Sequence, residues 1–194
     1  MPSERVSQQL RFMSEADRLK SVQRRTSLMD GSRLENTAEH SWHLAVVALI
    51  VREHAPPGLD HLRVLDLIAV HDLVEIDAGD TFAYDTAGIA TKAARERAAA
   101  ERIFGLLPSD QAQRLHALWG EFEAHDTPEA KFANAVDRFQ ALLQNAGLGG
   151  GTWHTHHLTR AAVLKRMAPI EEAIPGLWTA VVEIVEMFCP PDPA

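Results

Sequence analysis

The sequence has few residues of several kinds, and each shortage excludes a class of protein. It has one cysteine, Cys189, and one tyrosine among 194 residues. No disulfide can therefore form within the chain, and a metal site built from several thiolates is excluded. The first residues, MPSERVSQQLRF, lack the basic and then apolar segments of a signal peptide. We therefore expect a cytoplasmic protein.

Long apolar runs and an excess of positive charge are also missing. The longest apolar candidate, LAVVALIV at residues 44–51, is far shorter than the roughly 20 residues that span a membrane. Lysine and arginine number 19 against 27 acidic residues, which gives a net charge of -8 at pH 7. This balance argues against binding of nucleic acid polymers or anionic membranes by general electrostatic attraction. Any phosphate that the protein binds must be met by local cations.

Helical periodicity dominates the chain, and we find no alternating apolar and polar runs of the kind that predict strands. With 46% hydrophobic residues, the chain can bury a substantial core. We predict an all-α fold of about eight helices, forming a single domain over residues 1–194. The expected helices cover about 3–20, 36–54, 60–77, 86–105, a segment opened by Pro108, 127–147, 154–173 and 175–189.

Two local motifs support these boundaries. Asn36 and Glu39 have the spacing of a capping box, and Thr127 followed by Pro128 is typical of a helix start. The glycine-rich segment GLGGG at 147–151 lacks the Lys-Ser/Thr ending of a phosphate-binding loop. It is interpreted as a turn that ends a helix.

Histidine is abundant, with ten copies, and is a common metal ligand. In the second expected helix, His40 begins a row that continues through Leu44, Val47 and Val51. This spacing places His40 on the face turned toward the core, where a histidine can be either a satisfied core residue or a ligand. His43, one turn along, is a candidate partner that could orient a ligating histidine.

The third expected helix ends in ionisable residues that continue its apolar rows. Val64, Ile68, His71 and Glu75 form one row, and Asp72 extends the neighbouring row. An imidazole and two carboxyl groups are therefore expected to crowd together near one helix end.

Asp137 lies beside the apolar stripe of the sixth expected helix, between Val136 and Arg138. It could pair with Arg138, or it could face the core together with the other polar groups. Burying such groups without partners costs several kcal/mol each, and a shared cation is the simplest partner. Two imidazoles and two carboxylates suit a divalent transition metal better than calcium. The candidate ligands are His40, His71, Asp72 and Asp137.

The order of these residues resembles the H…HD…D signature of the HD-domain metal-dependent phosphohydrolases. The similarity is closest to the branch that contains the 5′-deoxynucleotidases. It rests on RRTSLMDGSRLEN at 24–36, NTAEHSWHLA at 36–45, HDLVEIDAGD at 71–80 and ANAVDRFQ at 133–140. The resemblance covers roughly residues 20–145, whereas the C-terminal helices at about 154–189 carry little motif information.

The resemblance implies a compact helical enzyme that uses one divalent ion, which in this family is Co, Mn, Mg, Zn or Fe. His40, His71, Asp72 and Asp137 would hold the metal. Glu75 would position or deprotonate the attacking water, and Asp80 would be a second acid in the pocket. Arg25 would bind the substrate phosphate, with Arg33 as a further candidate. The implied substrate is a small nucleotide, most plausibly a 5′-(deoxy)nucleoside monophosphate, and the implied assembly is a homodimer.

The sequence leaves three alternatives open. The substrate could be a phosphodiester, a nucleoside triphosphate or an alarmone, because the metal residues are shared among such enzymes. The protein could also be a non-catalytic binding module in which the metal is structural, although Glu75 and Asp80 would then have no purpose. The deoxynucleotidase branch tends to have Arg-Trp where this chain has Arg25-Thr26, so the choice between deoxyribose and ribose also stays open.

Overall fold

A computed structural model describes residues 2–191. Its α-helices are α1 (Glu4–Ala16), α2 (Thr37–Val51), α3 (His61–Val70), α4 (Glu75–Ala78), α5 (Thr86–Phe104), α6 (Ser109–Ala124), α7 (Pro128–Gly147), α8 (Gly151–Thr155), α9 (Arg160–Ala173) and α10 (Trp178–Phe188). Two strands, β1 (Gln23–Ser27) and β2 (Leu34–Asn36), form a hairpin, and 3₁₀ turns occur at Asp17–Ser21, Arg52–His54 and Pro175–Leu177. The helical fold predicted from the sequence is confirmed.

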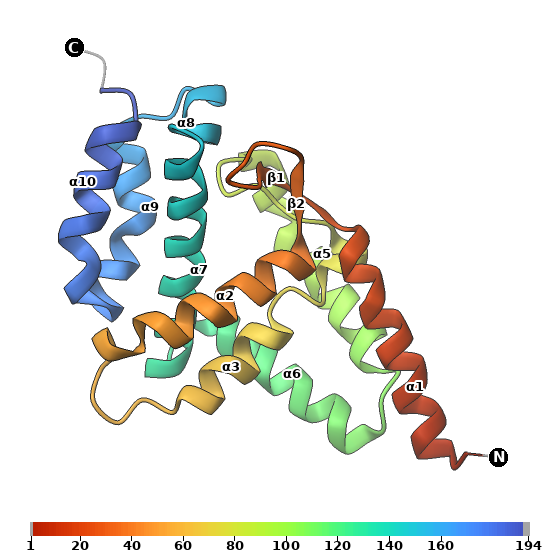
Figure 1. Ribbon diagram of the computed structural model, residues 1–194. Helices are drawn as coiled ribbons and strands as arrows, with labels where there is room; N and C mark the ends of the chain where they lie inside the picture. Colours follow the sequence, from red (N-terminus) through yellow and green to blue (C-terminus); the bar gives the residue numbers. More distant parts are fainter. Residues whose placement is uncertain (1, 192–194) are drawn as a thin grey trace.

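Helix α7 is the centre of the molecule. It contacts α2, α3, α6, α8, α9, α10 and β1, and Figure 1 shows it between the pair α9 and α10 on one side and α2 and α3 on the other. Thr127 caps its first turn through the amide of Ala130, and Pro128 follows at the first helical position, as predicted. Phe132, Val136 and Leu142 of this helix are fully buried. Because α7 is surrounded by other elements, side chains on most of its sides point into the core.

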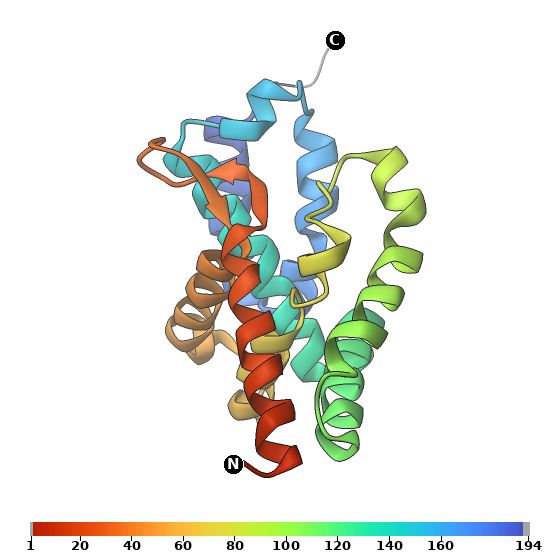
Figure 2. The same cartoon turned by 90° about the vertical axis from the view of Figure 1, so that its right-hand side faces the viewer.

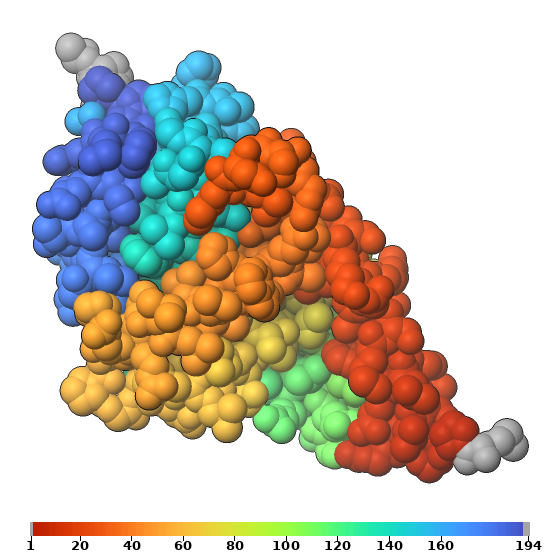
Figure 3. Space-filling model, in the orientation of Figure 1, coloured from red at the N-terminus to blue at the C-terminus, as the bar shows by residue number. Residues whose placement is uncertain are grey.

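The core is one continuous cluster that includes side chains from α2, α3, α5, α6, α7, α9 and α10. Helix α1 contributes no buried residue and lies along one edge of the molecule, beside α5 and α6 (Figures 2 and 3). Within residues 2–191, no helix is both long and apolar enough to cross a membrane.

The expectation that the chain has no sheet is wrong. Strands β1 and β2 pair antiparallel, with Gln23 opposite Asn36 and Ser27 opposite Leu34. The strands are only five and three residues long and mostly polar. They are therefore too short to show the alternation that identifies a strand in a sequence.

Two of the expected helices are interrupted. The helix expected over 60–77 ends at Val70, and a tight turn leads into α4. The helix expected over 154–173 is also split, because α8 ends at Thr155, His157 adopts a left-handed backbone, and Thr159 caps a new helix, α9. The apolar spacing on either side of each break fits a continuous helix, so periodicity did not reveal the breaks.

The other local predictions hold. Asn36 and Glu39 form a reciprocal capping box at the start of α2. The segment GLGGG ends α7, and Gly149, Gly150 and Gly151 all have positive φ angles. Residues with side chains rarely adopt this backbone, so these glycines allow the chain to turn directly into α8.

Candidate metal centre

His40 is positioned by the first turn of α2. The Asn36 side chain accepts a hydrogen bond from the Glu39 amide at 3.0 Å, and the Glu39 carboxylate accepts one from the Asn36 amide at 3.2 Å. These bonds satisfy amides that have no partner within the helix. His40 is fully buried and points into the core one turn before the fully buried Leu44.

His71, Asp72 and Glu75 lie where α3 gives way to a tight turn. His71 is the C-terminal cap of α3, and the next amides bond three residues back, from Leu73 to Val70 and from Glu75 to Asp72. Residues three apart lie on the same side of such a turn, which places Asp72 and Glu75 together. The break in the predicted helix thus turns these side chains toward His40.

The ligand candidates from α2, α7 and the turn after α3 meet in space. His71 Nε2 lies 3.0 Å from Asp72 Oδ2, and His40 Nε2 lies 3.8 Å from the same oxygen. Asp137 Oδ1 of α7 lies 3.0 Å from His40 Nε2. Ligand atoms of His40, His71 and Asp72 lie within 4.8 Å of one another. Residues separated by almost a hundred positions in the sequence therefore converge on one point.

The atoms at this point are those that a metal ion would satisfy. His40 Nε2, His71 Nε2 and Asp72 Oδ2 are buried, and within the described part of the chain none of them has a hydrogen-bond partner outside the cluster, where they face one another and Asp137. Buried polar atoms are normally paired, because an unpaired one costs free energy of desolvation. Two imidazole nitrogens with carboxylate oxygens match a divalent transition metal. The residues present therefore fit the ion that the sequence predicted.

A hydrogen bond from Nδ1 fixes the orientation of each histidine ring. His71 Nδ1 lies 2.8 Å from the carbonyl oxygen of Ile68 and donates to it, which leaves Nε2 free to face the cluster. His40 Nδ1 lies 3.1 Å from Gln140 Oε1. Gln140 Nε2 donates to Glu35 Oε1 at 3.1 Å, so the amide oxygen must be the atom that faces His40. His40 consequently carries its proton on Nδ1, and its Nε2 presents a lone pair to the cluster.

Glu35 and His43 complete this supporting network. Glu35 Oε1 also accepts a hydrogen bond from Gln144 Nε2 at 2.6 Å, and His43 Nδ1 lies 3.2 Å from Gln140 Nε2. The sequence had suggested that His43 could orient a ligand. In the structure, His43 instead contacts Gln140, and Gln140 is the residue that orients His40.

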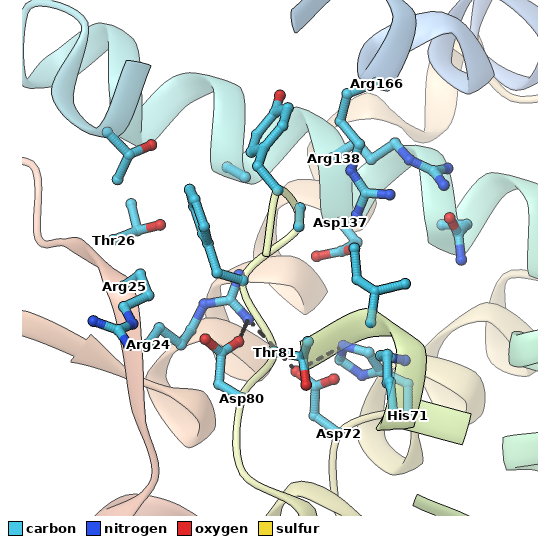
Figure 4. A pocket seen from close by; sticks show the side chains of 18 of the residues that line it. Arg24, Arg25, Thr26, His71, Asp72, Asp80, Thr81, Asp137, Arg138 and Arg166 are labelled. Atoms are coloured by element: carbon cyan, nitrogen blue, oxygen red, sulfur yellow. Dashed lines mark ion pairs between the residues drawn. The ribbon is translucent and has the colours of Figure 1, made fainter. Parts of the chain in front are cut away.

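The arginine that faces the cluster is Arg24 rather than Arg25. Successive side chains of a strand point to opposite sides, and in β1 Arg24 and Thr26 face inward while Arg25 is exposed at the rim of the cavity. Arg24 Nη1 lies 3.7 Å from Asp80 Oδ1 and 3.8 Å from Asp72 Oδ2, and its Nε lies 3.3 Å from Glu35 Oε2. Figure 4 shows Arg24 beside Asp80. Recognising β1 as a strand would have identified Arg24.

Glu75 and Asp80 are carboxyl groups beside the ligands. Glu75 is 6% exposed, and its Oε2 accepts a hydrogen bond from Thr37 Oγ1 at 3.0 Å. Burial and the nearby charges of Asp72 and Asp80 raise the pKa of Glu75 well above its usual value. Burial also raises the pKa of Asp80, although Arg24 opposes the effect. In contrast, the pKa of Asp137 is lowered, because nearby positive charge, including that of Arg24, outweighs the opposing effect of burial.

These groups form part of the wall of a cavity of about 340 Å³, which is within the range of small-ligand sites. The wall has three parts: the acidic cluster, an aromatic loop that contains Phe82 and Tyr84, and a basic part that contains Arg138 and Arg166. The sequence did not single out this basic part. The cavity can thus hold a small molecule with both a charged and a flat, apolar portion.

Two other histidines lie near the cavity. His125 is among the residues that line it. His156 is exposed and packs against Phe82, with 4.5 Å between ring centroids. Neither lies among the ligand atoms of the cluster.

Comparisons with known proteins agree with this geometry. The family model described as the HD domain matches residues 16–178. A crystal structure of a predicted metal-dependent phosphohydrolase from Magnetospirillum magnetotacticum MS-1 is 45% identical to this chain, covers 98% of each chain, and has a TM-score of 0.92.

The curated relatives that match this chain include several named as 5′-deoxynucleotidases. The 5′-deoxynucleotidase HDDC2 of Mus musculus is 32% identical over 136 residues, which is 70% of this chain and 67% of that protein. The human protein of the same name is 33% identical over 112 residues, covering 58% of this chain and 53% of the relative. The 5′-deoxynucleotidase hdd1 of Schizosaccharomyces pombe is 28% identical over 138 residues. The matched region thus spans between about half and two thirds of these relatives.

The unpaired buried atoms predict that a divalent ion stabilises the protein. Manganese or cobalt added to metal-free protein at about one hundred times its dissociation constant should raise the free energy of unfolding by about 2.7 kcal/mol. Thermal unfolding monitored by circular dichroism measures the shift. Asp72→Ala should abolish it, whereas Asp126→Ala, at an exposed position before α7, should retain it. An equal shift in the Asp72 variant would contradict the assignment of this ligand.

The hydrogen bond from His40 to Gln140 predicts an indirect effect on metal binding. Gln140→Leu should weaken metal affinity by about ten- to a hundredfold, because the imidazole loses the acceptor that fixes its orientation. Competition with a chromophoric chelator measures this affinity. Gln113→Leu, at an exposed position of α6, is the matched control. Unchanged affinity in the Gln140 variant would mean that packing alone orients His40.

Proposed function

This chain belongs to the HD domain family, and on that premise we propose that it is a metal-dependent phosphomonoesterase that releases phosphate from 5′-deoxynucleoside monophosphates. The observation that carries the proposal is the cluster of buried ligand atoms that have no hydrogen-bond partner outside the cluster, three of whose residues, His71, Asp72 and Asp137, line a small cavity. The names of the curated relatives and of the similar crystal structure support the reaction class and the substrate.

The residues that would hold the ion are His40, His71, Asp72 and Asp137. A bound divalent ion would lower the pKa of a coordinated water and neutralise phosphoryl oxygens. Asp72 and Asp137 have lowered pKa values and are ionised at neutral pH, as ligands must be. Several divalent transition metals accept such nitrogen and oxygen ligands.

Glu75 is placed to move the proton. In the reaction, a water oxygen forms a bond to phosphorus while the bond from phosphorus to the 5′ oxygen of the sugar breaks. Thr37 occupies one carboxylate oxygen of Glu75, which leaves the other to accept the proton of the attacking water. Its raised pKa makes Glu75 a stronger base than an ordinary carboxylate. The same proton can then pass to the leaving oxygen, giving nucleoside and inorganic phosphate.

Arg24 has a different role from the one expected for Arg25. Its guanidinium lies within 3.8 Å of carboxylates from Glu35, Asp72 and Asp80. We therefore propose that Arg24 chiefly balances the charge of the acidic cluster and holds Asp80 in place. Arg25, exposed at the rim, is a cation that an approaching phosphate meets first.

The aromatic loop supports a nucleoside as the leaving group. Phe82 and Tyr84 lie 5.5 Å apart between ring centroids and line the cavity. A nucleobase can stack on such side chains. A metal centre with a purely structural role would need neither this apolar surface nor the additional carboxyl groups of Glu75 and Asp80.

The outer face of α2 supports a homodimer. Trp42, Val46, Leu49 and Ile50 lie on successive turns and are 38–71% exposed, while Leu44 on the other side is in the core. A helix that is apolar on both sides normally buries both. Figure 3 shows α2 at the surface. We propose that this face meets its copy in a second subunit, in the reducing cytoplasm that the single cysteine favours.

Two measurements test the activity. Metal-loaded protein should release inorganic phosphate from deoxynucleoside monophosphates in a screen with manganese, cobalt, zinc and magnesium, and absence of release from any monophosphate would exclude the proposal. Glu75→Gln should lower kcat by about a hundred- to ten-thousandfold, because it cannot accept the proton. It should also bind metal normally, and Asp126→Asn is a matched control that should remain active.

The homodimer has its own test. The wild-type protein should sediment as a dimer in analytical ultracentrifugation, and Ile50→Glu should sediment as a monomer, because a charge cannot be buried in the apolar contact without a partner. Met187→Glu, at a similarly exposed apolar position on α10, should remain a dimer. A monomeric wild-type protein would overturn this proposal.

A further inference from the structure

Two arginines line the cavity without forming an ion pair. Arg138 belongs to α7 and Arg166 to α9, and Figure 4 shows both on the same side of the cavity, above Asp137. Among residues 2–191, neither guanidinium makes a hydrogen bond or an ion pair, and the Nε atom of Arg138 is buried without a hydrogen-bond partner. Both side chains are half-buried, and a partly buried cation is usually paired with an anion.

Two other cations of the cavity wall, Arg24 and Lys92, are compensated. Arg24 lies among three carboxylates, and Lys92 pairs with Glu96 at 2.8 Å and Glu123 at 3.6 Å. Asp137, which precedes Arg138 in the sequence, is in contact with His40. Arg138 and Arg166, together with the exposed Arg25 at the rim, are therefore the cations of this wall that are left to meet an anion from outside, and only Arg138 and Arg166 lie above Asp137.

The neighbours of the two arginines do not supply that anion. His125 also lines this part of the cavity, and its pKa is lowered by burial and by the positive charges of Arg138 and Arg166, so it is neutral at pH 7. The two guanidinium groups are half-buried on the same side of the cavity, and a dianion between them would relieve the repulsion of their like charges.

We propose that Arg138 and Arg166 form a clamp for the phosphate dianion of the substrate and for the inorganic phosphate that is released, an inference that rests on the proposed function. Guanidinium groups bind phosphate through paired, charge-assisted hydrogen bonds. The clamp lies beside Asp137, so a phosphate held there is next to a metal ligand. It also supplies the local positive charge that an acidic protein needs to bind phosphate.

Titration calorimetry with inorganic phosphate tests the clamp on the manganese-loaded protein. Arg138→Gln and Arg166→Gln should each weaken phosphate binding by about ten- to a hundredfold, because each removes charge-assisted hydrogen bonds. Lys165→Gln removes the same charge from an exposed neighbour on α9 and should bind phosphate as the wild type does. Metal content, measured in every variant, should not change.

Thermal unfolding separates a clamp from a structural pair. If the arginines serve phosphate, each variant without phosphate should unfold at the same temperature as the wild type or higher, since an uncompensated charge has been removed. Phosphate should then stabilise the wild type more than either variant. Lower stability without phosphate, or unchanged phosphate affinity in both variants, would overturn the clamp. Weak phosphate binding by the wild-type protein would also overturn the clamp, and this measurement does not depend on the folding of a variant.

These outcomes do not depend on turnover. If phosphate binding requires both arginines but no monophosphate is hydrolysed, the clamp stands and the proposed activity fails. If monophosphates are hydrolysed and the variants bind phosphate normally, the activity stands and the clamp fails.

Discussion

The structure depends on one constraint: buried nitrogen and oxygen atoms that point at each other must share a positive charge. His40 Nε2, His71 Nε2 and Asp72 Oδ2 are buried, and among the described residues they have no hydrogen-bond partner outside the cluster. Desolvation makes this arrangement unfavourable unless a cation joins the group. This unfavourable group lies where α2, α3 and α7 meet. The packing of these three helices therefore determines the distances between the ligand atoms. Moving any one of them would separate the ligand atoms.

The small hairpin is explained by the same constraint. Its strands are too short to add much to the core, yet they supply Arg24 and Glu35 to the buried cluster. Glu35 joins the hairpin to α7 through Gln140 and Gln144, and Gln140 in turn holds His40. A buried network of this kind is favourable only when most of its members are satisfied, because each lost partner exposes the others to the cost of desolvation. The hairpin therefore contributes to the site by orientation and charge balance rather than by hydrophobic burial.

The sequence allowed much of this site to be predicted because its ligands are ionisable residues at positions where apolar residues are expected. His40 continues an apolar row of α2, and His71 continues one of α3. Gln140 follows the same rule, since it lies one turn after Val136 on the buried face of α7, but a neutral amide attracts less notice than a charge. Arg24 could not be separated from Arg25 without knowing that they lie on a strand. The breaks after Val70 and Thr155 were not detectable either, because a tight turn uses the same apolar spacing as a helix.

The distribution of charge in the cavity reconciles an acidic protein with an anionic ligand. Asp137 and Arg138 are consecutive on α7, so one helix places a carboxylate toward the histidines and a guanidinium toward α9. Successive side chains of a helix point in directions about 100° apart. Both Asp137 and Arg138 can therefore be accommodated only if α7 has polar surroundings on two of its sides. The central position of α7 provides these surroundings. Because the arginines lie in the wall of a cavity, their field acts over a few ångströms on whatever enters, while the net charge of -8 governs the outer surface. Selectivity for a small dianion and a weak attraction for large anionic surfaces thus arise from the same arrangement of residues.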